Sequence, residues 1–238
     1  MLYFRSHFNR SASNSQPTMI IGNSVIHPSA EARNLGVTLD SSLRMINHVN
    51  SLCKAAWLSI RKIGQFRQYL DEKSTIRLVH AFVTSRLDSC NSLLYGLPER
   101  ELTKVQRVQN AAARLVLKIR RREHITSALY QLHWLPIKQR AVFKILLLTY
   151  KAIHGMSPAY ISELIQLYSP PRTLRSSSCS QLSKSANSST KFYGDRSFAY
   201  AAAHLWNKLP NSIRLAQSAT IFKSRLKTFL FTQHLGSE

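Results

Sequence analysis

The chain has 238 residues, 44% of them hydrophobic, and carries 33 Lys and Arg against 11 Asp and Glu, for a formal net charge of +22. This hydrophobic content excludes wholesale disorder, and no apolar run is long enough to span a bilayer. The charge excess predicts a polyanionic partner, with nucleic acid first and an anionic membrane surface second.

The first segment with a structural pattern is β-type. Residues 1–17 are expected to be a disordered start. Two short β-type runs, Thr18–Ile21 and Ser24–His27, flank a Gly-Asn pair and predict a hairpin. Asn34–Asp40 alternates apolar with small or polar residues, which predicts one further strand.

The rest of the chain has helical periodicity. An apolar stripe predicts a first helix from Leu43 to about Tyr69, and Asp71 is expected to cap a second. A nearly all-apolar run predicts a central buried helix over Ile137–His154, closed by Gly155. Further helices are expected over Ile125–Leu132, from Ser157-Pro158 to about Leu167, over Phe198–Trp206 with Asp195 as its cap, and from about Ser218.

Composition divides the helical part into segments. We expect a helical bundle over 43–122, a helical extension over 123–168 and a Ser/Pro-rich linker over 169–191. A C-terminal helical segment follows over 192–238. With the β region at 18–42, the predicted fold class is mainly α.

The basic helix over Glu99–Arg121 carries the strongest functional pattern. Cations recur on one face at intervals of four and three, opposite an apolar stripe, along about 32 Å. Like charges at this spacing repel, so the pattern predicts an anionic ligand and specifically the phosphates of a nucleic acid. The expected binding residues are Arg100, Lys104, Arg107, Arg114, Lys118 and Arg121, with Lys54 and Arg61 on a neighbouring helix. The alternative is an ordinary solvated charged surface.

Residues typical of catalysis or metal binding are scattered. Two-metal phosphoryl transfer needs converging carboxylates, yet the only adjacent acids, Asp71 and Glu72, are explained by a helix start, and Asp40 by a turn or cap. No Cys-x-x-Cys pair or glycine-rich phosphate loop occurs. We therefore expect no catalytic residue, metal, cofactor or small-molecule substrate. Three widely spaced cysteines favour a reducing compartment, nucleus or cytoplasm, over secretion.

Six ordered blocks resemble a known family. They are NLGVTLDSSL (34–43), HAFVTSRLDSCNSLLYGLP (80–98), VQRVQNAAARLV (105–116), LHWLPIKQRAVFKILLLTYKAIHG (132–155), YGDRSFAYAAAHLWNKLPNSIR (193–214) and FKSRLKTFLF (222–231). Together they resemble the C-terminal region of the reverse transcriptases of non-LTR, LINE-type, jockey-like retrotransposons. The resemblance implies that residues 18–42 are the end of the polymerase palm, that 43–122 is thumb-like and that the remainder is the extension after the thumb.

The resemblance also implies what this chain lacks. The family's aromatic-Ala-Asp-Asp metal motif is not in the sequence, so no catalytic residue carries over. The expected function is that of a truncated RNA-directed DNA polymerase fragment that binds RNA, DNA or hybrid backbone without a polymerase site. The alternatives are a helical interaction module, or a decayed remnant that needs the rest of the enzyme to fold. A cationic peripheral membrane protein is a third.

Overall fold

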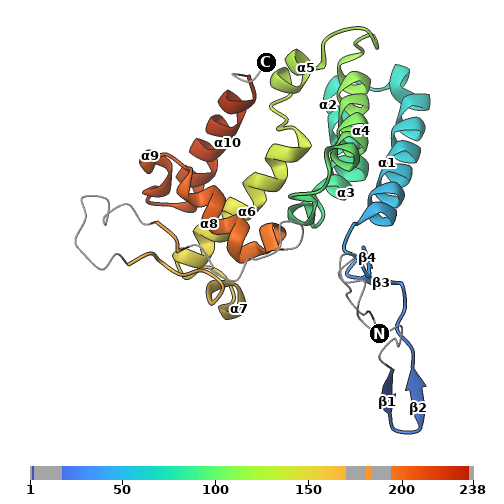
Figure 1. Cartoon of the computed structure of the whole chain (residues 1–238). Coiled ribbons are helices and arrows are strands. Elements are labelled where there is room, and N and C mark those ends of the chain that lie inside the picture. The colour runs from blue at the N-terminus through green and yellow to red at the C-terminus, as the bar shows by residue number, and fades with distance from the viewer. Residues whose placement is uncertain (1, 3–17, 170–180, 184–193, 236–238) are drawn as a thin grey trace. The chain divides into compact units, whose positions relative to one another are not determined.

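The computed structural model describes residues 2, 18–169, 181–183 and 194–235 (Figure 1). Within them the chain is mainly helical and its strands lie between residues 19 and 40, which confirms the predicted fold class. The expected disordered start and most of the expected linker lie outside the described residues. The chain divides into two compact units: unit 1 comprises Met1–Ser89 with Leu97–Arg120, and unit 2 comprises Cys90–Gly96 with Arg121–Glu238.

The first hairpin forms as predicted. Strands β1 (Met19–Ile21) and β2 (Ser24–Ile26) pair antiparallel, with Ile20 opposite Val25. Gly22 takes a positive φ of 58° in the turn, a conformation that costs glycine little.

The second β element is a hairpin, so the prediction of a single strand over Asn34–Asp40 is wrong. Strands β3 (Glu31–Asn34) and β4 (Val37–Asp40) pair antiparallel around a tight turn. Leu35 and Gly36 both have positive φ, 46° and 83°, as the two central residues of a type I′ turn do. β3 escaped prediction because its sequence, EARN, has no alternation of apolar and polar residues.

Helices form the rest of unit 1. In chain order they are α1 (Ile46–Phe66), the 3₁₀ turn η1 (Arg67–Tyr69), α2 (Glu72–Val79), the π-helical turn η2 (His80–Thr84), α3 (Ser85–Asp88) and α4 (Glu99–Leu117). The Asp71 carboxylate accepts from the Ser74 backbone N–H at 3.1 Å, which confirms it as the cap of α2. The core contains fully buried Val49, Ala56, Val79 and Val105.

Helix α4 ends at Leu117, four residues before the predicted end at Arg121. Lys118 takes a left-handed conformation with φ 55°, which stops the helix. The buried Arg67 guanidinium donates to the last carbonyls, from Nε to Leu115 O at 2.8 Å and from Nη2 to Val116 O at 2.7 Å. These bonds satisfy carbonyls that a helix end leaves without an intrahelical partner.

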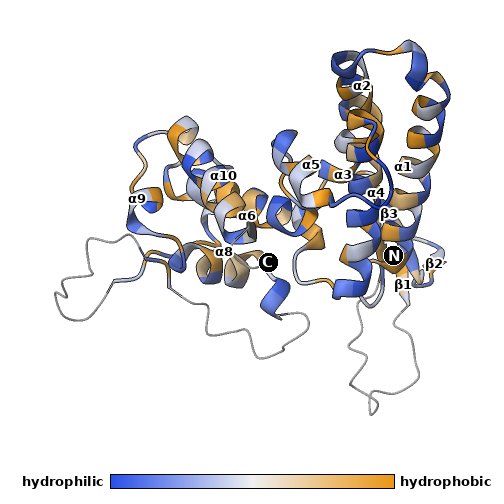
Figure 2. Cartoon of the chain, turned by 90° about the horizontal axis from the view of Figure 1, so that it is seen from above, coloured by the Kyte–Doolittle hydropathy of each residue, from blue (hydrophilic) through white to orange (hydrophobic). Residues whose placement is uncertain are grey.

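The described part of unit 2 is mainly helical, with one isolated antiparallel β-bridge between Leu167 and Leu182. Its elements are the 3₁₀ turn η3 (Asn91–Leu94), α5 (Ile125–Gln131), α6 (Ile137–Ile153), α7 (Ala159–Ser162), the 3₁₀ turn η5 (Gly194–Arg196), α8 (Phe198–Asn207), α9 (Asn211–Arg214) and α10 (Ala219–Leu235). As predicted, α6 is the central helix, packed by α8 and α10, and buried hydrophobic residues from all three helices share a core. Figure 2 colours the helices by hydropathy. The Tyr150 and Phe222 rings stack there at 4.3 Å, and Phe222 also meets the fully buried Trp206.

Two predicted helix boundaries in unit 2 are wrong. The helix expected from Pro158 to about Leu167 closes after Ser162, as the single short α7. Asp195 lies in η5, and the residue that precedes α8 is Ser197.

Candidate nucleic-acid interface

The candidate interface begins with the packing of α1 against α4 in unit 1. Lys104 Nζ of α4 donates to Asn50 Oδ1 of α1 at 3.0 Å, and further along both helices Gly64 lies beside the Leu115 side chain. From the first contact to the second, residue numbers increase along both helices, so α1 and α4 lie side by side and run parallel (Figure 1).

One edge of α1 therefore adjoins α4 along its length. Asn50, Lys54, Trp57, Arg61 and Gly64 recur at intervals of four and three, so they share one stripe of the helix. Because the first and last members touch α4, the three between them lie along the edge of α1 beside α4. Lys54 and Arg61 are exposed there, and the Trp57 side chain between them is 45% exposed.

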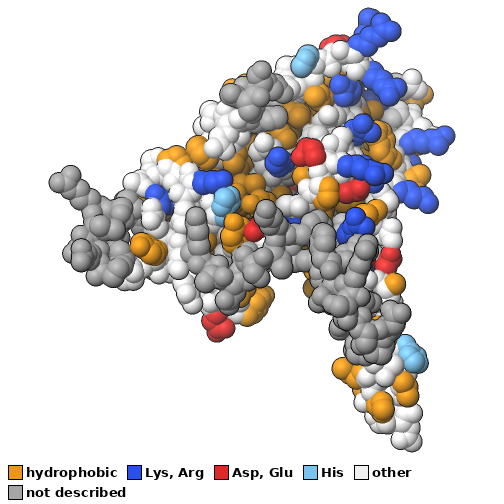
Figure 3. Space-filling view, viewed as in Figure 1, with side chains coloured by type: hydrophobic (Ala, Val, Ile, Leu, Met, Phe, Trp, Pro, Cys, Tyr) orange, Lys and Arg blue, Asp and Glu red, His pale blue; other side chains and the backbone are white. Residues whose placement is uncertain are grey.

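The outward face of α4 adds further cations. Arg100 and Arg107 are exposed and lie opposite the stripe that buries Val105 and Val108. We name Lys54, Arg61, Arg100 and Arg107 the basic seam, since they line the adjacent exposed sides of two packed helices. Lys and Arg side chains gather over this part of unit 1, with a few acids among them (Figure 3).

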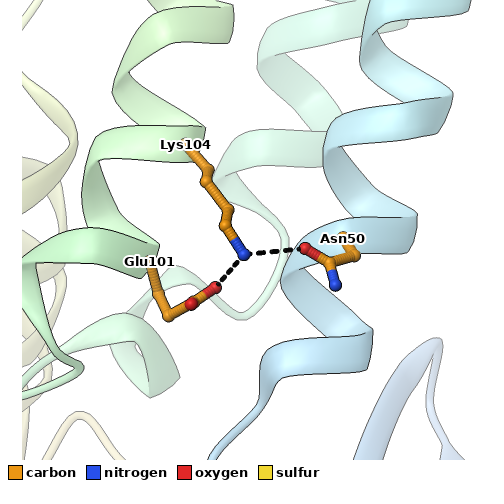
Figure 4. Close-up of polar contacts among 3 residues, drawn as sticks. All are labelled: Asn50, Glu101 and Lys104. Carbon is orange, nitrogen blue, oxygen red and sulfur yellow. Dashed lines mark hydrogen bonds and ion pairs between the residues drawn. The ribbon is translucent and has the colours of Figure 1, made fainter.

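Lys104 is already engaged within the protein. Its ammonium lies 2.8 Å from Glu101 Oε2 and also bonds Asn50, across the gap between α4 and α1 (Figure 4). The Glu101 side chain is only 7% exposed, so its carboxylate is shielded from water, whereas the Lys104 side chain is 30% exposed. The predicted face was assumed to lack interleaved acids, and Glu101 corrects that assumption because it neutralises Lys104.

The predicted row of six cations on one face of a single helix does not form. Arg114 is half-buried and makes an interaction within the protein. Lys118 is exposed but lies just beyond the helix, in a left-handed conformation. Arg121 lies past the end of α4 and belongs to unit 2. On α4 the helical face therefore keeps two exposed cations of the predicted six, Arg100 and Arg107.

Trp57 was missed by the sequence reasoning, although the signal was present. It lies three residues after Lys54 and four before Arg61, in the same stripe. A half-exposed indole between cations offers a flat surface on which a nucleic-acid base can stack. Of the three tryptophans, Trp134 and Trp206 are buried, which makes Trp57 the exposed one.

Three further properties bear on function: clusters of metal-ligating side chains, membrane-spanning helices and similarity to known proteins. Across the described ranges, no three His, Cys, Asp or Glu side chains gather as a metal site would need. No described helix combines the length and the apolar character needed to cross a membrane. Comparisons of the chain with family models, curated proteins and solved structures found no match. The reverse-transcriptase resemblance therefore depends on the six sequence blocks.

Proposed function

We propose that this chain binds the sugar-phosphate backbone of nucleic acid through the basic seam. In this proposal it acts as the thumb-like C-terminal part of a non-LTR reverse transcriptase and has no polymerase site of its own. The observation that carries the proposal is the placement of Lys54, Arg61, Arg100 and Arg107 on adjacent exposed sides of two parallel, packed helices.

Binding by such a surface does not depend on the base sequence of the nucleic acid. Cations that contact phosphates release condensed counterions, so the affinity falls with salt by a slope of roughly −0.9 per contact, or about −3.6 for four contacts on duplex DNA. Phosphate contacts carry no base information. Stacking on Trp57 would add affinity for single-stranded segments without strong sequence preference, because every base has a π-face.

A neutralising variant tests the proposal. Changing Lys54, Arg61, Arg100 and Arg107 together to Gln should weaken hybrid binding and flatten its salt slope by about 3 to 4, since each lost phosphate contact removes about 0.9. Fluorescence anisotropy titrations of labelled RNA–DNA hybrid at several salt concentrations measure both quantities.

A charge-matched control separates a site from overall charge. Changing the exposed lysines Lys62, Lys73, Lys208 and Lys223 to Gln removes the same charge outside the seam. This control should keep the wild-type slope. Equal slopes for the two variants would overturn the assignment of the seam.

One observation favours the alternative of a protein-docking module. The β1–β2 hairpin exposes apolar side chains, with Ile20 72% and Ile21 58% exposed, and a two-stranded sheet leaves unpaired edges. Such a surface suits pairing with other strands, and the rest of a reverse transcriptase is the partner that the resemblance implies.

The proposed role also implies a cellular compartment. A nucleic-acid backbone is met in the nucleus or cytoplasm, and both are reducing. The described cysteines, buried Cys53 and exposed Cys90, are free thiols, as such a compartment favours.

A further inference from the structure

A second cationic feature of unit 1 lies outside the basic seam. A pocket of about 380 Å³ opens between the β3–β4 hairpin, α1 and the end of α3. Its size lies in the usual range for small-molecule sites. The residues considered above for the seam take no part in its lining.

The charge of the pocket is one-sided. Arg33 of β3 and Arg86 of α3 line it, and none of its lining residues is Asp or Glu. The neighbouring acids already make interactions: the Glu31 carboxylate accepts from Asn47, the Asp40 carboxylate accepts from Ser42, Arg44 and Met45, and Asp88 is engaged as well. Two guanidinium groups facing one space repel each other, and a dianion between them removes that repulsion.

Further donors line the same pocket. The Thr38 backbone N–H donates to His48 Nδ1 at 3.4 Å, so Nδ1 acts as the acceptor and the neutral ring carries its proton on Nε2. Burial lowers the pKa of His48, which keeps the ring neutral near pH 7. The Ser51 hydroxyl donates to the His48 carbonyl oxygen at 2.9 Å, so the uncharged donors of the lining are His48 Nε2 and the Ser89 hydroxyl.

The remaining lining is apolar. Val37, Leu52 and Ala55 contribute hydrocarbon surface. A ligand that matches both parts has a charged oxyanion at one end and a flat or apolar body at the other.

We infer that this pocket binds an organic phosphate monoester of about nucleotide size, with the phosphate held by Arg33 and Arg86 and the body resting on Leu52 and Ala55. A free nucleoside monophosphate and the 5′-phosphorylated end of a strand present the same chemistry. The inference differs from the expectation of no small-molecule ligand. It is also independent of the basic seam, which would contact internal phosphates along a strand.

Calorimetric titration of the full chain with AMP, with adenosine and with short oligonucleotides tests the inference. AMP should bind at least about tenfold more tightly than adenosine, because only AMP supplies the charge-assisted bonds. If the occupant is a strand end, the 5′-phosphorylated oligonucleotide should bind more tightly than its unphosphorylated form by a similar factor. Either outcome supports the pocket, and the two together identify the source.

Arginine variants test whether the phosphate binds in this pocket. Arg33→Gln with Arg86→Gln should weaken the phosphate-dependent binding at least about tenfold. The charge-matched control, Arg44→Gln with Arg77→Gln, changes two exposed arginines outside the lining and should retain it. The four-residue Gln variant of the basic seam should retain it as well, which separates this inference from the proposed function. The inference is overturned if the phosphate adds no affinity in either pair, AMP against adenosine or phosphorylated against unphosphorylated oligonucleotide, or if the two arginine pairs show equal losses.

Discussion

Buried charged residues of unit 1 lie where helical spacing continues an apolar stripe. Arg67 follows buried Ile60 and Ile63 at intervals of seven and four, and Glu101 precedes Val105 by four. Burying a charge is costly unless it is paired or hydrogen-bonded. Arg67 bonds three carbonyls, and Glu101 holds Lys104. A charged residue within an apolar stripe therefore indicates pairing inside the protein, which the spacing of the cations alone does not indicate.

Asp40 shows the same principle at the start of α1. Its Oδ1 accepts from the Ser42 hydroxyl at 2.7 Å and from the Arg44 N–H at 3.0 Å, and its Oδ2 accepts from the Met45 N–H at 2.6 Å. Burial by itself raises the pKa of Asp40, but the bonds from Ser42, Arg44 and Met45 together outweigh it and lower the pKa. The carboxylate ties the end of β4 to the residue before α1, so the expected turn or capping role is confirmed.

The lowered pKa of Asp40 predicts a pH-dependent contribution to stability. The ionised carboxylate stabilises the folded state above the unfolded pKa of about 3.9, and the contribution is lost as pH falls through the lower folded pKa. Asp40→Asn places an amide donor against the Met45 N–H, and should cost about 1–2 kcal/mol at pH 7. Urea unfolding at pH 7 and near pH 3 should show the gap to wild type shrinking in acid, whereas Glu163→Gln, at an exposed position, should show no gap.

At the scale of the element, α4 shows how a helix end is decided by a neighbouring helix. Its sequence continues with helix-compatible residues through Arg121, and the helical periodicity alone gives no reason to stop. Lys118 turns into the left-handed region, while Arg67 from the end of α1 occupies the terminal carbonyls. The cations after Leu117 therefore leave the helical face.

Replacing Arg67 should loosen this helix end. Arg67→Lys keeps the charge but cannot bond Leu115 O, Val116 O and Leu70 O together, because an ammonium lacks the planar fork of a guanidinium. We expect a loss of about 2–3 kcal/mol in the free energy of unfolding, with faster hydrogen exchange in the last turn of α4. Arg61→Lys, on the exposed edge of α1, should change stability by less than about 0.5 kcal/mol. Equal stability of the two variants would contradict the capping role.

At the scale of the whole molecule, the stability of the folded state depends on the net charge and on the division into two units. A net charge of +22 destabilises a compact state through self-repulsion, while each unit has its own buried core. A polyanion that binds the folded chain relieves the repulsion and adds binding free energy to stability.

Thermal unfolding with and without nucleic acid therefore distinguishes the two proposed roles. If the chain folds alone and binds backbone, an RNA–DNA duplex at 100 times its Kd should add about 2.7 kcal/mol and raise Tm by roughly 5–10 °C. Calorimetry at low salt measures the shift, and high salt should abolish it. A chain that shows no cooperative transition, or that aggregates with duplex present, would support the module that needs its missing partner.

The sequence by itself determined the mainly helical fold, the first hairpin, the Asp71 cap and the central helix α6, because local periodicity and capping residues fix these elements. It also determined the large cationic excess and the resemblance to reverse transcriptases. Only the tertiary structure decided which cations face outward. Helical spacing alone does not show that Lys104 reaches Asn50, that Arg67 meets the end of α4, or that the edge of α1 with Lys54, Trp57 and Arg61 lies beside α4, since these relations depend on how α1 packs against α4.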